Sequence, residues 1–284
     1  PRVNKEEICP NCDENLVEAK RRLLLRIIFV DVVIWFFSAG AGYFLAGKTL
    51  EPIREAMEEQ KRFIADASHE LRTPLTALKT QIEVALRDKK PDLDTQQNVL
   101  KGSLEDLADI EELTNDLLVL SYYTENGKKL EFSEVNLKEV VERTAKKFET
   151  RAEEKELDLE LELSDIMLAG SKESLEETIS IFLDNEFKYT SEGSIKVKTY
   201  VAKSYAVIEI IDTGIGISEE DLPHIFDRFY RADSSRTKQD YPGFGLGLSV
   251  AKRIIELHNG IVEVKSVLGE GSTFIIKLPH VRLS

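Results

Sequence analysis

The N-terminal part of the chain contains one long apolar run. Between residues 27 and 47 only Asp31 is charged. This length is close to the roughly 20 residues that an α-helix needs to cross a bilayer. We therefore predict a transmembrane helix over 23–47 after an N-terminal tail over 1–22. The run is too long for a cleaved signal peptide, and a buried soluble helix is the weaker alternative.

Two further segments repeat apolar residues every three or four positions, the period of one helix face. The first has Ile64, Ala67, Leu71, Leu75, Leu78, Ile82 and Leu86, and the second has Leu100, Leu104, Leu107, Ile110, Leu113, Leu117 and Leu120. A turn signal, Lys89-Lys90-Pro91-Asp92, separates them. Because two helices with one apolar seam each cannot bury those seams alone, we predict an antiparallel hairpin over 48–126 that dimerises into a four-helix bundle.

The pattern becomes mixed from about Leu130 onward. Residues 157–163 alternate apolar and polar side chains, as a half-buried strand does, and 195–211 and 261–278 each read as a pair of strands. Asn136 is placed to cap a helix, and another helix is expected around Leu175. We predict an α+β sandwich over 127–284, with a helix layer on a mostly antiparallel sheet.

Composition limits the possible partners. The chain has 284 residues and a net charge of −14, which argues against nucleic acid as a partner. Basic residues flank both ends of the apolar run, so the positive-inside rule does not orient the span. The chain opens on Pro1 instead of methionine, and we expect further sequence upstream.

The only two cysteines form one Cys9-Pro-Asn-Cys12 segment. A structural zinc site usually needs four ligands, and the sequence has no second pair. We favour an incidental pair in the tail. Half of a truncated zinc ribbon and a redox pair remain open.

His69 and Glu70 are adjacent in the first periodic segment, and the histidine lies about half a turn from the apolar face. We therefore expect its side chain in solvent. Pro74 has no N–H and crowds the carbonyl of Glu70, so we expect a helix bend just past the histidine. An exposed histidine beside a carboxylate suits a nucleophile with its base.

Four segments of the C-terminal domain suggest phosphate and base recognition. In the first, 184–190, the Asn185 side-chain oxygen suits a magnesium ion already held by phosphates. In the second, Asp212-Thr-Gly214-Ile-Gly216, a carboxylate can accept from an adenine amino group. The third, 226–231, ends in Arg231. The fourth, 243–247, opens a helix whose N-terminal N–H groups can bind phosphate. Residues 232–242 are expected to form a lid.

These segments together resemble the sensor histidine kinases of two-component signalling systems. His-Glu-Leu-Arg-Thr-Pro-Leu at 69–75 is close to the family's H box, and the four C-terminal segments resemble its N, G1, F and G2 boxes in the same order. The likeness covers roughly 50–279. It implies that 48–126 is a dimerisation and histidine phosphotransfer hairpin and that 127–284 is a catalytic ATP-binding domain of the histidine kinase and Hsp90-like type.

The resemblance implies an ATP-dependent protein-histidine kinase. Such an enzyme phosphorylates His69 from MgATP, with Glu70 as its base, and passes the phosphoryl group to an aspartate of a response regulator receiver domain. Thr73 matches the position that places water for dephosphorylating that partner, so phosphatase activity is a weaker expectation. The ATP-binding residues implied are Asn185, Lys188, Tyr189, Asp212, Gly214, Gly216, Arg231, Gly243, Gly245, Leu246 and Gly247, with Asn185 also the Mg²⁺ ligand.

Location and partners follow from this reading. An ATP-using region must be cytoplasmic, so we expect the span in the plasma (inner) membrane with the C-terminal region inside the cell. The expected partners are a second copy of the chain, the receiver domain and the lipid bilayer, but no nucleic acid.

Some positions differ from the family pattern. Glu186 replaces a usually small residue, Phe244 replaces a small hydroxyl residue, and Ile181 stands where asparagine is frequent. Two alternative functions stay open: an ATP-driven conformational clamp, and a membrane scaffold with a degenerate kinase region. The histidine in a helical hairpin argues against the clamp, and only Glu186 and Phe244 support the scaffold.

Overall fold

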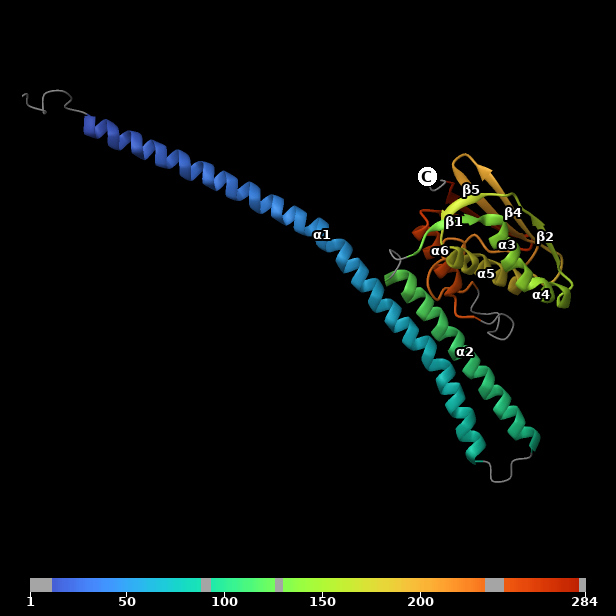
Figure 1. Ribbon diagram of the computed structural model, residues 1–284. Helices are drawn as coiled ribbons and strands as arrows, with labels where there is room; N and C mark the ends of the chain where they lie inside the picture. Colours follow the sequence, from blue (N-terminus) through green and yellow to red (C-terminus); the bar gives the residue numbers. More distant parts are fainter. Residues whose placement is uncertain (1–11, 88–92, 126–129, 233–242, 281–284) are drawn as a thin grey trace, which may run out of the picture. The chain divides into compact units, whose positions relative to one another are not determined.

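The computed structural model describes residues 12–87, 93–125, 130–232 and 243–280 (Figure 1). It divides into two compact units, 1–64 and 65–284, and each is described here by itself. Cys9, the turn expected at 89–92 and nearly all of the lid expected at 232–242 lie outside the described residues.

The first unit consists of the N-terminal part of helix α1, which runs over Cys12–Arg87. Within Leu16–Arg87 one apolar stretch has a mean hydropathy of 2.1 and is not buried at all, which is enough by length and composition to cross a membrane. Large apolar side chains such as Trp35, Phe36 and Tyr43 are more than two-thirds exposed. Such an apolar surface suits lipid better than water.

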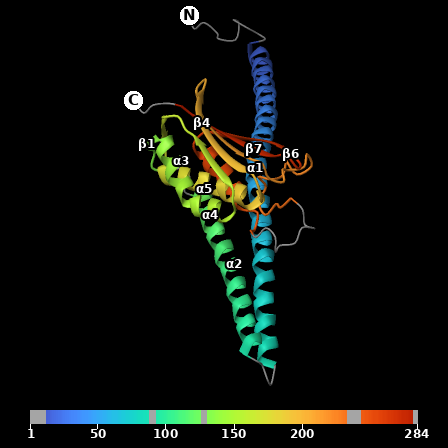
Figure 2. The same ribbon diagram turned by 90° about the vertical axis from the view of Figure 1, so that its right-hand side faces the viewer.

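The second unit begins with a helical hairpin. Its first arm is the end of α1, and its second is α2, Leu93–Glu125, which lies alongside α1 in both views (Figures 1 and 2). The Gln81 amide donates to Asp106 at 3.0 Å across the two arms. Leu100 and Leu104 are 64% and 66% exposed, so the hairpin leaves part of its apolar seam uncovered. Helix α1 continues on both sides of Pro74, and the bend expected there stays a prediction.

The C-terminal domain contains two sheets. A ribbon pairs β1 (Ser133–Asn136) with β3 (Met167–Gly170) in antiparallel fashion. The larger sheet has the order β2-β4-β5-β7-β6, with β2 at Asp158–Glu162, β4 at Ser194–Ala202, β5 at Tyr205–Asp212, β7 at Gly271–Pro279 and β6 at Ile261–Val267. The predicted strands and both predicted strand pairs are confirmed. The pairing of β2 with β4 is parallel, which the sequence pattern did not predict.

Helices cover one face of the larger sheet (Figure 2). They are α3 (Leu137–Ala145), the short 3₁₀ helix η3 (Lys146–Phe148), α4 (Glu149–Glu154), α5 (Lys172–Tyr189) and α6 (Gly247–Leu257). Asn136 caps α3 as predicted, because its side chain accepts from the N–H groups of Lys138 and Glu139. Phe182, Ile208 and Ile276 are buried in the core that forms between the two layers.

Helix α2 also contacts α6 of the C-terminal domain. Leu113 and Leu120 are fully or almost fully buried, whereas Leu100 and Leu104 of the same predicted seam are exposed. Tyr123 near the end of α2 is buried, and its hydroxyl donates to Glu177 of α5 at 2.5 Å. The apolar face of α2 is therefore divided. Its first half, with Leu100 and Leu104, is exposed, and its second half packs on the C-terminal domain.

Candidate active site

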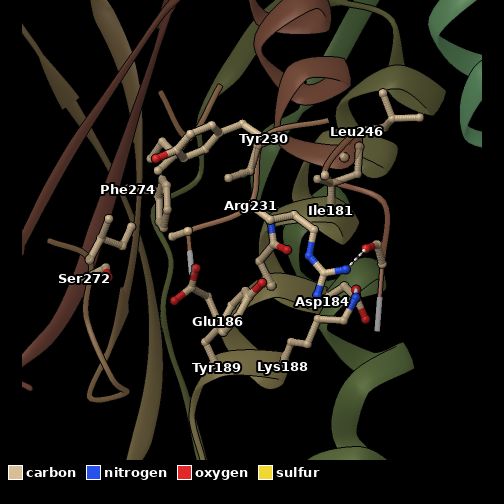
Figure 3. Close-up of a pocket in the computed structure, with 18 of the residues that line it drawn as sticks. Ile181, Asp184, Glu186, Lys188, Tyr189, Tyr230, Arg231, Leu246, Ser272 and Phe274 are labelled. Atoms are coloured by element: carbon tan, nitrogen blue, oxygen red, sulfur yellow. Dashed lines mark hydrogen bonds and ion pairs between the residues drawn. The ribbon is translucent and has the colours of Figure 1, made fainter. Parts of the chain in front are cut away.

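A cavity of about 310 Å³ lies where the end of α5, the loop after β5 and the start of α6 meet (Figure 3). Ten of the eleven residues predicted to bind ATP line it: Asn185, Lys188, Tyr189, Asp212, Gly216, Arg231, Gly243, Gly245, Leu246 and Gly247. Gly214 does not line the cavity but donates its N–H to Asp212. Residues as far apart in sequence as Asn185 and Gly247 are thus brought together at one place.

Asp212 is fixed by the backbone on both sides. One carboxylate oxygen accepts the N–H of Gly214 at 2.6 Å and the other accepts the N–H of Ser272 at 2.7 Å. The side chain is only 5% exposed. A Cβ atom on Gly214 would collide with the carbonyl of Tyr189, so the close approach of these two segments requires glycine. The carboxylate is therefore held in one orientation at the cavity wall.

Apolar side chains form the walls near Asp212. They are Ile215, Ile217, Ile225 and Phe274. A concave, largely apolar site with one oriented carboxylate is suited to a flat heterocyclic base with an exocyclic amino group. This end of the cavity is called the base end below.

Glu186 also lines the cavity, and its side chain is 3% exposed (Figure 3). Burial raises the pKa of Glu186 well above its usual value, and a hydrogen bond with Asp212 and the charge of Asp212 raise it further. The raised pKa favours the protonated form of Glu186, whose proton is shared with the Asp212 carboxylate. The sequence identifies this residue only as a departure from a small one, and the structure places it next to the predicted base-recognition residue.

The opposite side of the cavity carries the positive charge and is called the phosphate end below. The Lys188 ammonium forms an ion pair with Asp184 at 3.6 Å, and the Arg231 guanidinium donates to the carbonyl of Gly243 at 2.9 Å (Figure 3). Helix α6 starts here, and its N-cap residue Leu246 makes no side-chain cap. Because the first N–H groups of a helix have no intrahelical acceptor, this terminus favours an anion.

A divalent cation would find few protein ligands at this end. The described residues contain no group of three or more His, Cys, Asp or Glu side chains arranged to hold a metal ion. Asn185 lines the cavity and offers one neutral oxygen. These residues fit an ion that takes most of its ligands from phosphates and water, as Mg²⁺ does.

Aromatic residues of 226–231 connect the cavity to the core. The Tyr230 hydroxyl donates to Asp221 at 2.6 Å, and the Phe226 ring meets Phe274 edge-on at 6.5 Å. Phe229 has a φ of 62°, which is uncommon for a bulky residue. Tyr230 lines the cavity, whereas Phe226 and Phe229 do not.

Two residues of helix α2 also line the cavity, and neither was predicted as a site residue. Glu112 and Asp116 of α2 line the cavity together with Lys188 and Arg231. Burial raises the pKa of Asp116 to about 6, Glu112 adds to this, and Lys188 opposes it. The signal in the sequence was the placement of Asp116 between Leu113 and Leu120, on a face that is otherwise apolar.

His69 lies elsewhere in the same unit. Its side chain is exposed, as predicted, and lines a groove between the two arms of the hairpin together with Arg72 and Thr73. The Thr73 hydroxyl donates to the backbone carbonyl of His69 at 3.3 Å. Glu70 is half-buried. Neither His69 nor Glu70 lines the cavity that contains Asp212.

The matches to known protein families likewise separate the helical hairpin with His69 from the domain that contains the cavity. Residues 170–282 match the family described as histidine kinase-, DNA gyrase B- and HSP90-like ATPase, and residues 59–126 match the His Kinase A (phospho-acceptor) domain. The signal transduction histidine-protein kinase ArlS of Staphylococcus aureus (strain USA300) is 35% identical over 228 residues, which cover 80% of this chain and 50% of that protein. The chain therefore spans about half the length of this relative.

Solved structures give the same result. The histidine kinase AdeS of Acinetobacter baumannii matches with a TM-score of 0.60 and 27% identity, over 75% of this chain and 98% of that one. Full-length ShkA in complex with AMPPNP matches with a TM-score of 0.57 and 22% identity, over 76% of this chain and 45% of that one. The second likeness concerns the fold alone.

Proposed function

This chain belongs to the sensor histidine kinases of two-component signalling, and we propose that it phosphorylates its own His69 from ATP bound in the cavity around Asp212. One observation carries the proposal: four separated segments, predicted to contact one nucleotide, line one cavity. The cavity also offers an oriented acceptor at the base end and cations with a helix N-terminus at the phosphate end.

The residues divide the recognition of ATP between them. Asp212 accepts the hydrogen bond of the adenine amino group, and the apolar walls contact the two faces of the ring. Lys188, Arg231 and the first turn of α6 counter the charge of the phosphates. Asn185 contributes one oxygen to the Mg²⁺ ion that the phosphates hold. The γ-phosphate of ATP supplies the group that is transferred.

His69 is the proposed acceptor. One ring nitrogen forms the bond to phosphorus while the bond from phosphorus to the ADP oxygen breaks. Glu70 accepts the proton of the other ring nitrogen or holds its tautomer, which makes the attacking nitrogen a better nucleophile. Because His69 does not line the cavity, the ATP-binding domain must move relative to the hairpin before transfer.

The phosphoryl group then passes to an aspartate of a response regulator receiver domain. Members of the family generally dimerise, and the exposed Leu100 and Leu104 support a homodimer through the hairpin. Thr73 stands one helical turn from His69 and supports a phosphatase activity toward the partner. We propose one membrane span within 23–47, with the catalytic region in the cytoplasm where ATP is found.

Labelling with γ-labelled ATP tests the proposal. The full chain in lipid nanodiscs should acquire label that is labile in acid and stable in base, as a phosphohistidine is. His69→Gln should abolish the label while nucleotide binding persists, and Asp212→Asn should abolish both. Label that survives His69→Gln would reject the assignment of the acceptor, and ATP hydrolysis without label would favour the conformational clamp.

A further inference from the structure

The phosphate end of the cavity is closed on one side by α2. Glu112 and Asp116, one helical turn apart, line the cavity with Lys188 and Arg231 and are called the acidic pair here. They come from the hairpin helix, whereas the other lining residues belong to the C-terminal domain. The buried Leu113 and Leu120 and the 2.5 Å hydrogen bond from Tyr123 to Glu177 hold α2 against that domain.

The acidic pair places negative charge at the contact between α2 and the C-terminal domain. Asp116 is half-buried and is surrounded mainly by other carboxylates, those of Glu112, Glu177 and Asp184. Lys188, which also pairs with Asp184, is a nearby cation whose charge lowers the pKa of Asp116. The acidic pair therefore adds negative charge to the phosphate end of the cavity. Lys188 and the N-terminus of α6 are groups at this end that favour the anionic part of a ligand.

A bound triphosphate would bring several negative charges to this place, and a Mg²⁺ ion bound to the phosphates would neutralise only part of them. Charges at the mouth of a protein cavity are only partly screened by water and salt, so the triphosphate and the acidic pair repel one another. Adenosine fills the base end without adding any charge. The triphosphate alone should therefore disfavour the contact between α2 and the C-terminal domain.

We propose that the contact between α2 and the C-terminal domain is autoinhibitory and that the acidic pair lets the triphosphate of ATP release it, freeing the ATP-binding domain to reach His69. This inference rests on the proposed function, since it requires that ATP binds with its phosphates beside Lys188. Because coupling between two equilibria is reciprocal, a contact that is opened by ATP must also weaken the binding of ATP. Removing the two charges should strengthen ATP binding and leave adenosine binding unchanged.

The experiment compares the full chain in nanodiscs with two double variants by calorimetry at low salt. One is Glu112→Gln with Asp116→Asn. The control is Glu105→Gln with Asp109→Asn, which has the same spacing on the same helix but lies on exposed positions outside the cavity lining. We expect the first variant to bind ATP about tenfold more tightly, the control to stay within about twofold of wild type, and the gain to shrink in 0.5 M salt.

Adenosine serves as the reference ligand in all three proteins. Equal adenosine affinity shows that the cavity is folded in the variants, so a change for ATP alone reports on charge. Hydrogen exchange should in addition increase over 113–123 of wild-type α2 when ATP is added, but not when adenosine is added.

An ATP affinity that is unchanged or weakened in the acidic-pair variant overturns the inference, and weakening would make the pair part of the ATP site. Equal gains for ATP and adenosine would also overturn it, because the effect would not depend on phosphate charge. Failure of the proposed function looks different: wild type would then bind neither ligand and acquire no label on His69.

Discussion

Replacing Asp212 by asparagine should lower the free energy of unfolding of the ATP-binding domain by about 3 kcal/mol. The wild-type carboxylate accepts two backbone N–H groups, from Gly214 at 2.6 Å and from Ser272 at 2.7 Å, in a position that is 5% exposed. Asparagine keeps one acceptor oxygen and turns its NH₂ group toward the other N–H. A hydrogen bond to a charged group contributes about 1.5–3 kcal/mol, and a buried donor without a partner costs about 1–3 kcal/mol.

Calorimetric melting of the full chain measures this effect. For a domain of about 150 residues, 1 kcal/mol corresponds to roughly 3 °C, so the transition of the ATP-binding domain should fall by about 9 °C. Asp165→Asn is the control, because Asp165 is exposed and accepts only a side-chain hydrogen bond, from Asn136 at 2.8 Å. Its effect should stay below about 1 kcal/mol.

The refuting result is a small shift for Asp212→Asn. If the variant melts within about 2 °C of wild type, the two backbone hydrogen bonds do not hold the carboxylate as described. Loss of ATP binding in such a protein would then report only the lost contact with the base.

Three further changes test buried groups. Burial raises the pKa of Glu186 above 4.5, so the folded state holds a proton that the unfolded state releases. The free energy of unfolding should therefore fall as the pH rises above about 4.5. Glu186→Gln should remove this pH dependence in urea titrations. Burial lowers the pKa of His258 below 6.5, so its contribution to the free energy of unfolding is present above pH 6.5 and should be lost as the pH falls through the lowered value. His258→Gln should reduce this loss of stability at low pH in the same titrations. An unchanged loss would assign it to other groups. Tyr123→Phe deletes the hydrogen bond to Glu177 and should speed hydrogen exchange at the end of α2 several-fold, while equal exchange would mean that the contact contributes little.

Local signals in the sequence predicted most of the elements. The strand pairs at 195–211 and 261–278 and the cap at Asn136 are encoded by neighbouring residues, and they are confirmed. The parallel pairing of β2 with β4 was missed because strand partners that are distant in sequence leave no local signal.

The residues of the candidate site could be predicted in part from the sequence. Together and in their order, the motifs resemble those of sensor histidine kinases, so Asn185, Asp212 and Arg231 could be assigned through that resemblance, and they line one cavity. Periodicity shows that a helix face is buried but not what covers it. For that reason Leu113 was assigned to the bundle seam, and Asp116 was not associated with the nucleotide at all.

The Glu186 side chain has a consequence for the design of inhibitors. It takes up space in the cavity at a position where the sensor histidine kinases that this chain resembles usually have a small side chain. A purine mimic with a substituent that fits beside the small side chain of those kinases should clash with Glu186 here and lose affinity. Selectivity among otherwise similar nucleotide sites can therefore be built on this one side chain.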